Sequence, residues 1–323
     1  DVMPAYTHLQ RAQPVSGAHW MLSHFWPLER DRNRLAAASK AAAVLPLGSG
    51  AIAGSAFPVS RVFLKEALGF RAVSPNSIDA VGDRDFIAET LFALSVLGAH
   101  LSRLAEDLIL FGSSEFGFVR YSDAYSTGSS MMPQKRNPDA LELARGSGAR
   151  MLGDLVALLG TIKGLPSGYN KDLQEDKRSL FDAVDGMTLL LPAVAGSLST
   201  LSFNRERMKT AVTNSMMATD LADYLVRKRV AFREAHGAVG QLVQEAESMG
   251  IEMTELPFAS FKAACPAFEE DVMQELLPHA SLSHRDVEGG TGPTAVRLQI
   301  EAAKTILTPE AEITRGNEIS RRS

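Results

Sequence analysis

Four short polar segments of the sequence hold the side chains best suited to move protons or to bind anions. The first covers residues 6–10 and reads Tyr-Thr-His-Leu-Gln. Its His8 carries an imidazole, which can accept or donate a proton near pH 7. A single histidine of this kind is more often structural or on the surface. Residue type alone therefore does not assign it a catalytic role.

The second segment covers residues 126–138 and reads STGSSMMPQKRNP. Gly128 gives mobility, Ser129 and Ser130 supply hydroxyls and amide protons, and Lys135 places a positive charge just before an expected helix start. Such a combination suits an anion or a developing oxyanion. The spacing of a phosphate-binding P-loop is absent. A flexible surface loop is an equally good interpretation of these residues by themselves.

The third and fourth segments are residues 165–177, LPSGYNKDLQEDK, and residues 75–86, PNSIDAVGDRDF. Both are rich in hydrogen-bonding groups beside very apolar stretches. A solvated loop with a helix cap would explain most of the third segment. A capped helix start would explain the fourth.

The elements that must position these segments are helices. Between Asp83 and Gly112 the large apolar residues recur in steps of three to five, which approximates one face of a helix. They are Phe86, Leu91, Leu94, Leu97, Leu101, Leu104, Leu108 and Phe111. A helix of this length is roughly 45 Å long, so a bundle is its natural setting.

Three more long helices are expected. One begins at Asn137-Pro138-Asp139, with Asn137 as the N-cap, and runs to about Ile162. Another covers about residues 180–201 and contains Pro192, and an earlier one covers about residues 17–44 and contains Pro27; both prolines predict kinks. These helices and the first one are the candidates for a single bundle.

The predicted fold is all-α, with long bundled helices and a smaller C-terminal helical domain. Residues 1–203 are assigned to the central bundle, residues 204–308 to shorter helices with frequent breaks, and residues 309–323 to a polar tail. Sustained strand alternation and internal repeats are absent from the sequence.

Composition excludes several classes of protein. The chain has 33 Lys and Arg against 38 Asp and Glu, a net charge of −5, which argues against a general nucleic-acid binder. Cys265 is the only cysteine, so no internal disulfide forms, and a reduced cytoplasmic setting is expected. No uninterrupted apolar run reaches the roughly 18–20 residues that span a bilayer. The chain opens DVMPAYTHLQ, without methionine or a secretory signal, so further sequence is expected upstream.

Taken in order, four motifs resemble argininosuccinate lyase and its near relatives, the delta-crystallins. These are MPAYTHLQRAQP, SPNSIDAVGDRDF, GSSMMPQKRNPDALELARG and LPSGYNKDLQEDK, and ATDLADYLVRK, FREAH and GGTGP also fit. GSSMMPQKRNP is common to the aspartase/fumarase superfamily, whereas YNKDLQEDK narrows the resemblance to argininosuccinate lyase. The similarity extends over about residues 2–307.

The resemblance implies reversible β-elimination of argininosuccinate to arginine and fumarate, a carbon–nitrogen lyase reaction without metal or organic cofactor. Ser129 matches the base, whose anion must be stabilised. His8 matches the acid partner or proton relay, and Glu142 the carboxylate that raises the basicity of this histidine. Lys135 and Asn137 match the pair that stabilises the aci-carboxylate. Substrate-binding positions are matched by Thr7, Tyr169, Gln174 and Lys177.

The resemblance also implies a homotetramer in which each active site draws segments from three subunits. The family has a further N-terminal domain, with residues that contact the substrate, before the MPxYTHLQ segment. Those residues are not in this sequence, so little or no activity is expected of these 323 residues alone. Pro27 departs from the small residue usual in relatives, without an evident cost to the chemistry.

Three alternatives remain at this point. One is another lyase of the superfamily, such as adenylosuccinate lyase, although the motif YNKDLQEDK argues against it. The second is a non-catalytic structural protein of the delta-crystallin kind. The third is a domain with a new binding role, which no feature of the sequence supports specifically.

Overall fold

The computed structural model describes residues 1–308 and divides into two compact units. One unit comprises Trp26–Phe203. The other comprises Asp1–Phe25 together with the described residues from Asn204 onward. The predicted all-α class is confirmed, since the described strands form only two-stranded pairs.

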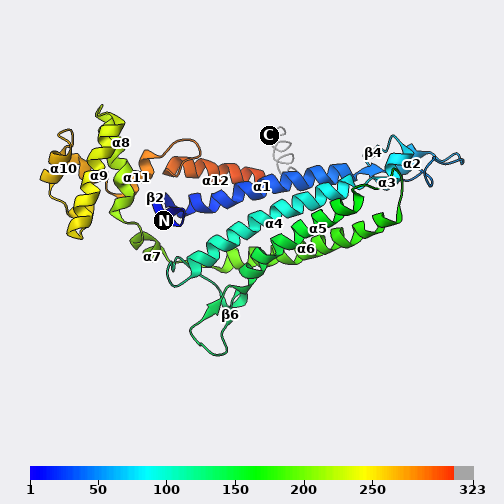
Figure 1. Ribbon diagram of the computed structural model, residues 1–323, viewed down its shortest axis with the longest axis horizontal. Coiled ribbons are helices and arrows are strands. Elements are labelled where there is room, and N and C mark those ends of the chain that lie inside the picture. The colour runs from blue at the N-terminus through cyan, green and yellow to red at the C-terminus, as the bar shows by residue number, and fades with distance from the viewer. Residues whose placement is uncertain (309–323) are drawn as a thin grey trace, which may run out of the picture. The chain divides into compact units, whose positions relative to one another are not determined.

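The first unit is built on four long helices (Figure 1). They are α1 (Gly17–Ala42, from Trp26 onward in this unit), α4 (Asp85–Gly112), α5 (Asp139–Ile162) and α6 (Asp176–Thr200). α4 packs along both α5 and α6, and α5 packs along α6. The apolar stripe expected on α4 is buried from Leu91 to Phe111, so the helix occupies the core of the unit.

α4 and α5 approach each other closely at a pair of glycines. A Cβ on Gly98 would lie 3.0 Å from the Cα of Gly148 and 3.2 Å from the Sδ of Met151. One turn earlier on α4, Ser95 Oγ donates a hydrogen bond to the carbonyl oxygen of Met151 at 3.0 Å. The absence of side chains at the two glycines therefore sets the distance between these helices.

α1 is tied to α4 by a buried polar contact. The carboxylate of Asp31 lies 2.6 Å from Nδ1 of His100 on α4 and accepts a hydrogen bond of 2.8 Å from Arg34 on its own helix. Asp31 is 1% exposed, and both of its oxygens are paired, as a buried carboxylate requires. Pro27 and Pro192 lie inside α1 and α6 as the sequence indicated.

α6 buries only part of its apolar surface within this chain. The face that it buries in this chain is made of Ser179, Ala183, Met187, Leu190, Val194 and Ser197. Phe181, Val184 and Leu191, which belong to the same helix, are exposed. Helical spacing identifies an apolar face but does not say whether it meets the same chain or another one.

One end of the bundle is closed by short elements between α1 and α4. β3 (Val44–Leu45) pairs in parallel with β4 (Ala72–Val73), and α2 (Arg61–Leu68) and α3 (Ser77–Gly82) complete this end. Arg61 holds them together by donating hydrogen bonds to the carbonyl oxygens of Leu45, Leu47 and Ser74.

The start of α3 confirms the capped helix start that the fourth segment suggested. Asn76 Oδ1 accepts hydrogen bonds from the amides of Ile78 and Asp79 at 2.9 and 3.1 Å.

Short strands and 3-10 turns connect the helices elsewhere in this unit. β5 (Val119–Arg120) pairs antiparallel with β8 (Ser202–Phe203), and β6 (Thr127–Gly128) pairs antiparallel with β7 (Arg136–Asn137). The 3-10 turns η1 (Asp123–Tyr125) and η2 (Lys171–Glu175) precede β6 and α6 respectively.

The second unit joins the start of the chain to its C-terminal helices. β1 (Val2–Thr7) and β2 (Gln10–Ser16) form an antiparallel hairpin that leads into α1. The helices that follow β8 are α7 (Arg205–Thr210), α8 (Ala218–Arg227), α9 (Phe232–Met249), α10 (Phe258–Ala264), α11 (Pro278–His284) and α12 (Pro293–Leu307). The turns η3 (Asn214–Met217), η4 (Met253–Glu255) and η5 (Glu270–Gln274) lie between them.

The core of this unit lies among α8, α9 and α10, where Leu221, Leu242 and Phe261 are fully buried. A smaller cluster joins Leu22 and Phe25 of α1 to Val296 and Ile300 of α12. In the GGTGP loop that precedes α12, Thr291 Oγ1 accepts a hydrogen bond of 2.9 Å from the amide of Ser16.

The division into units places residues 1–25 differently from the sequence assignment. The boundary after Phe203 falls where the helical pattern changes, but the hairpin groups with the C-terminal helices and not with the bundle. β1 packs against α7, and β2 packs against η3 and α11, with Met3 1% exposed in this contact region. The polar tail assigned to residues 309–323 lies outside the described residues.

Two segments, Asp85–Gly112 and Lys171–Thr200, are long and apolar enough to cross a membrane by length and composition alone. α4 forms the centre of the bundle and packs along both α5 and α6. A core helix of a water-soluble bundle meets the same criterion, so this observation is weak support for a membrane span.

Candidate active site

Residues 127–137, which we call the Ser129 loop, form a hairpin that projects from the helices of the bundle (Figure 1). At its base Thr127 pairs with Asn137 and Gly128 pairs with Arg136, and the amide of Ser129 donates to the carbonyl oxygen of Lys135 at 3.2 Å. The base is fixed from both sides, because the hydroxyl of Thr127 donates to Asp139 and Arg136 forms an ion pair with Asp123. At the tip, residues 130–135 are exposed to solvent and Ser129 is half-buried.

The hydroxyl oxygen of Ser129 accepts two backbone hydrogen bonds. The donors are the amides of Met131 and Met132, at 3.2 and 3.0 Å. Hydrogen bonds to the charged form of a group favour its ionisation. The turn that follows Ser129 therefore supplies the kind of stabilisation that a serine alkoxide requires to act as a base.

Lys135 and Asn137 lie at the other end of the same loop and contact each other. Lys135 Nζ donates a hydrogen bond of 2.6 Å to Asn137 Oδ1. The sequence assigned Asn137 as the N-cap of the next helix, and this assignment is wrong. α5 begins at Asp139 after Pro138, without a side-chain cap, because the amide oxygen of Asn137 is used by Lys135. This pair offers one ammonium and one amide NH₂ to an anion.

Glu142 lies in the first turn of α5, on the same helix start. Its carboxylate is 3.9 Å from the guanidinium of Arg145, which donates a 2.6 Å hydrogen bond to Glu106. Burial and the nearby charge of Glu142 raise the pKa of Tyr121 to about 12. Tyr121 is therefore a neutral hydrogen-bond donor, and it donates to the carbonyl oxygen of Leu108 at 2.7 Å.

His8 lies at the tip of the β1–β2 hairpin, in the other unit. His8 and Leu9 form the two-residue connection between Thr7 and Gln10, and both have positive φ, 54° and 58°. Two consecutive positive φ values are typical of a type I′ hairpin turn, which normally contains Asn or Gly. The hairpin thus presents an exposed imidazole in a conformation that costs energy locally, and such strain is concentrated at functional sites.

Burial raises the pKa of Tyr6, two residues before His8, although Arg11 opposes the shift through a hydrogen bond and its charge. Tyr6 and Arg11 face each other across the hairpin. Thr7 is exposed beside the turn, with the partner Gln10 opposite.

Tyr169, Gln174 and Lys177 cluster where the connection from α5 enters α6. Gln174 Nε2 donates a 2.6 Å hydrogen bond to the phenol oxygen of Tyr169. Lys177 Nζ donates to Asp176 Oδ1 at 2.9 Å. All three of these polar side chains are exposed.

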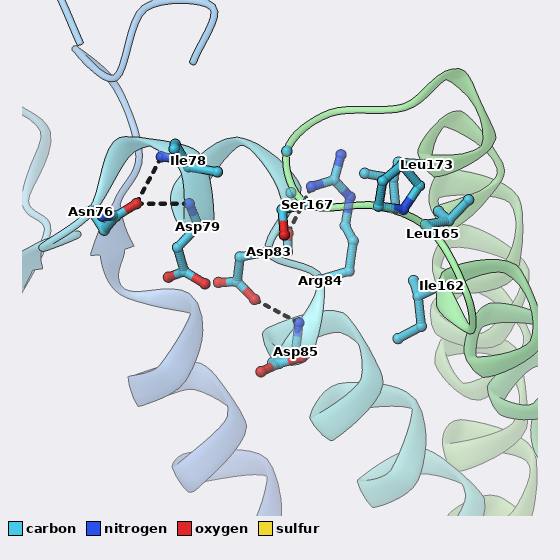
Figure 2. Close-up of a pocket in the computed structure, with 13 residues that line it drawn as sticks. Asn76, Ile78, Asp79, Asp83, Arg84, Asp85, Ile162, Leu165, Ser167 and Leu173 are labelled. Atoms are coloured by element: carbon cyan, nitrogen blue, oxygen red, sulfur yellow. Dashed lines mark hydrogen bonds between the residues drawn. The ribbon is translucent and has the colours of Figure 1, made fainter. Parts of the chain in front are cut away.

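A cavity of about 510 Å³ lies beside this cluster, between residues 76–85 and residues 162–173 (Figure 2). The carboxylate-bearing residues Asp79, Asp83 and Asp85 line one part of it. Ile162, Leu165 and Leu173 line the apolar part, close to Arg84. The third and fourth polar segments of the sequence therefore meet in space.

The structure does not bring all the predicted residues of the bundle unit together. Ser129, Lys135, Asn137 and Glu142 lie at the start of α5, whereas Tyr169, Gln174 and Lys177 lie beyond its end. α5 has 24 residues, so at about 1.5 Å per residue the two groups are separated by roughly 36 Å. One small substrate cannot contact both groups of a single chain.

Sequence reasoning missed two polar residues of this region, Arg84 and Asp176. Arg84 Nε donates to Asp176 Oδ2, and Asp176 is 3% exposed. In the sequence, only the large number of charged residues in the two motifs that contain Arg84 and Asp176 pointed to these two positions. Within residues 1–308, no group of three or more His, Cys, Asp and Glu side chains is placed to hold a metal ion.

Comparison with known proteins first shows the class of protein, a lyase. Residues 2–153 match the family described as Lyase, and residues 215–283 match the family described as Argininosuccinate lyase C-terminal. The crystal structure of EDDS lyase in complex with formate is similar, with a TM-score of 0.87 and 29% identity over 95% of this chain and 63% of that one. The 3-carboxy-cis,cis-muconate lactonizing enzyme of Pseudomonas putida shares the fold, with a TM-score of 0.71 and 18% identity over 95% of this chain and 67% of that one. The fold is that of the helical lyases of the aspartase/fumarase type.

The curated relatives are more specific. Argininosuccinate lyase of Roseiflexus sp. (strain RS-1) is 58% identical over 94% of this chain and 67% of its own length. That of Bacillus anthracis (strain CDC 684 / NRRL 3495) is 49% identical over 96% of this chain and 67% of its own length. The chain belongs to the argininosuccinate lyase family and spans about two thirds of the length of these relatives.

Proposed function

We propose that this chain supplies the central and C-terminal parts of an argininosuccinate lyase, which converts argininosuccinate reversibly into arginine and fumarate. The observation that carries the proposal is the Ser129 loop. Its hydroxyl accepts hydrogen bonds from the amides of Met131 and Met132, and the Lys135–Asn137 pair lies in the same hairpin. This reaction is a step of arginine biosynthesis, and in organisms with a urea cycle a step of that cycle.

The proposed chemistry begins with removal of a proton from the carbon next to a substrate carboxylate. Ser129 is the base, and the two amides stabilise its anion before it accepts the proton. The electron pair left on the carbon moves into the carboxylate and forms an aci-carboxylate. The ammonium of Lys135 and the amide NH₂ of Asn137 stabilise its extra negative charge.

The reaction is completed when the aci-carboxylate returns its electron pair to form the C=C bond of fumarate and the carbon–nitrogen bond breaks. His8 donates a proton to the departing guanidinium nitrogen, directly or as a relay, and Glu142 supports this histidine by raising its basicity. Thr7, Tyr169, Gln174 and Lys177 bind the substrate, which carries three carboxylates. A hydroxyl, a phenol, an amide and an ammonium are suitable donors for these groups.

The active form is proposed to be a homotetramer with shared active sites. The separation of the Ser129 group from the Tyr169 group by the length of α5 supports this, because segments of different copies must meet at one substrate. Large apolar side chains are exposed on the bundle helices, among them Leu152, Val156, Phe181 and Leu189. An exposed apolar surface of this kind is typical of an interface between subunits. A soluble cytoplasmic enzyme is the setting that we propose.

A substrate panel tests the function. The product of the complete reading frame is incubated with argininosuccinate, adenylosuccinate or aspartate, and fumarate is measured by its absorbance. We expect fumarate from argininosuccinate alone. Release from adenylosuccinate or aspartate would identify another lyase of the superfamily, and release from none would favour the non-catalytic, delta-crystallin-like alternative. Light scattering of the same protein tests the tetramer, which a stable folded monomer at micromolar concentration would contradict.

A further inference from the structure

Asp176, the first residue of α6, lies between two cations. Its side chain is 4% exposed. Oδ2 accepts a hydrogen bond from Arg84 Nε, and Oδ1 accepts one of 2.9 Å from Lys177 Nζ. Both oxygens of this buried carboxylate are therefore paired, as burial of a charge requires.

The surroundings of Asp176 keep it ionised. Burial alone would raise its pKa, but the hydrogen bonds and charges of Lys177 and Arg84 hold the pKa below the usual value for aspartate. Its place at the start of α6 acts in the same direction, because the positive end of a helix favours a negative charge. Asp176 is thus a permanent acceptor at neutral pH.

Arg84 fixes Asp176 to a different part of the fold. It immediately precedes α4, and its Nη1 donates a 2.6 Å hydrogen bond to the carbonyl oxygen of Asp83. Its side chain is 15% exposed, and it lies against the cavity of Figure 2. The planar guanidinium therefore joins the starts of α4 and α6 in one defined geometry.

Arg84, Asp176 and Lys177 form a set of three charged residues, of which Lys177 is the most exposed. Its side chain is 55% exposed, although its ammonium is held by the buried Asp176. An ammonium has three N–H donors, and Asp176 takes one of them, so the others are free to bind a carboxylate. With two cations and one anion, the set also keeps one positive charge at the surface.

We propose that Asp176, held in place by Arg84, is a positioning residue that directs the ammonium of Lys177 toward a carboxylate of the substrate. This rests on the function proposed above and deepens it. A lysine has a long flexible side chain, and fixing its ammonium before substrate arrives removes part of the entropy cost of binding. Arg84 and Asp176 act on the substrate only through Lys177.

The test uses the product of the complete reading frame with Asp176→Asn and Arg84→Met, each made alone and each combined with Lys177→Met. Arg84→Lys is the conservative variant. Asp182→Asn is the matched control, because Asp182 lies on the same helix and forms an exposed ion pair with Arg150 at 3.4 Å. The readouts are kcat and KM for argininosuccinate, and the titration of the Asp176 carboxyl carbon by ¹³C NMR.

Asp176→Asn and Arg84→Met are expected to raise KM about tenfold with kcat within about twofold, because they weaken binding in the ground and transition states alike. Arg84→Lys should recover part of this loss, and Asp182→Asn should change neither constant. In the Lys177→Met background Asp176→Asn should have almost no further effect on KM, because the effects of mutations at directly coupled residues are not additive. Arg84→Met should also raise the pKa of Asp176, whether or not the enzyme turns over.

Two results would overturn the proposal. One is an unchanged Asp176 titration in Arg84→Met. The other is an equal effect of Asp176→Asn with and without Lys177, which would mean a structural role only. A wild-type protein without lyase activity would instead refute the proposed function, so the two failures are distinguishable.

Discussion

Lys135 Nζ donates a 2.6 Å hydrogen bond to the amide oxygen of Asn137, across the base of the Ser129 loop. The contact occupies the acceptor side of the amide and leaves its NH₂ group as a donor. Asn137 is thereby prepared to donate to an anion while Lys135 supplies the charge. The same contact explains why Asn137 does not cap α5, as the sequence had suggested.

Replacing Asn137 by leucine is predicted to reduce kcat by about 10²–10³-fold, comparable with the loss of one oxyanion-hole donor. Asn137→Leu keeps the size of the side chain but removes its donors and the acceptor for Lys135. The assay is fumarate release by the product of the complete reading frame under saturating argininosuccinate. A variant that loses affinity but keeps wild-type kcat would show that Asn137 binds substrate without stabilising the aci-carboxylate.

Gly98→Val is predicted to destabilise the bundle by about 1–3 kcal/mol, as overpacking of a tight contact does. The added side chain meets Gly148 and Met151 where α4 and α5 are closest. The free energy of unfolding is measured by urea denaturation. Gly240→Ala, on α9 with open space around it, is the control and is expected to stabilise by about 0.5–1 kcal/mol. Equal stability of Gly98→Val and wild type would contradict the close approach.

Asp176 is predicted to make stability dependent on pH in the acid range. Its pKa is held below the usual value, so its contribution is present above the unfolded pKa of about 3.9 and is lost as the pH falls through the lower, folded value. Asp176→Asn should cost about 1.5–3 kcal/mol at pH 7, since it weakens hydrogen bonds to charged groups. Urea denaturation at a series of pH values measures the difference, which should shrink on acidification. A difference that stays constant below pH 4 would mean that the carboxylate is not the source.

The helices of the bundle were predictable because their apolar spacing is regular and their lengths are unusual. α4 shows this best, with a predicted stripe from Leu91 to Phe111 that is buried. α6 shows the limit, because Phe181 and Leu191 belong to an apolar face that its own chain does not cover. Periodicity carries no information about which chain provides the partner. The grouping of the β1–β2 hairpin with the C-terminal helices depends on contacts over more than 200 residues, such as that of Ser16 with Thr291.

For the site, residue type and motif order pointed to Ser129, Lys135 and Asn137, and the structure places these three in one hairpin. Sequence could not show that the hydroxyl of Ser129 accepts two amide hydrogen bonds, since these depend on the path of the turn. It also could not reveal Arg84 and Asp176 as a pair, because 92 residues separate them. The partner of a charged residue in a polar motif can be identified only when the fold is known.

Residues 1–323 alone are predicted to show little or no turnover. The Ser129 loop projects from its own bundle with its tip exposed, and the relatives extend beyond the region that this chain matches. Positioning of reactants is worth up to roughly 7–11 kcal/mol of a barrier, so an incomplete substrate clamp should cost orders of magnitude. The measurement compares residues 1–323 with the product of the complete reading frame. Turnover by residues 1–323 at about 1–10³ per second, as is usual for enzymes, would show that the clamp is complete without further sequence.

The role of Ser129 is the central claim, and Ser129→Ala tests it most directly. Wild type and variant are assayed with argininosuccinate in the product of the complete reading frame, by the absorbance of fumarate, with Ser130→Ala as the matched control in the same loop. We predict that Ser129→Ala lowers kcat by about 10²–10⁴-fold, the usual contribution of a general base, while KM changes little and Ser130→Ala keeps most of the activity. Wild-type kcat in Ser129→Ala would contradict the assignment of the base and, with it, the account of the hairpin as the catalytic loop.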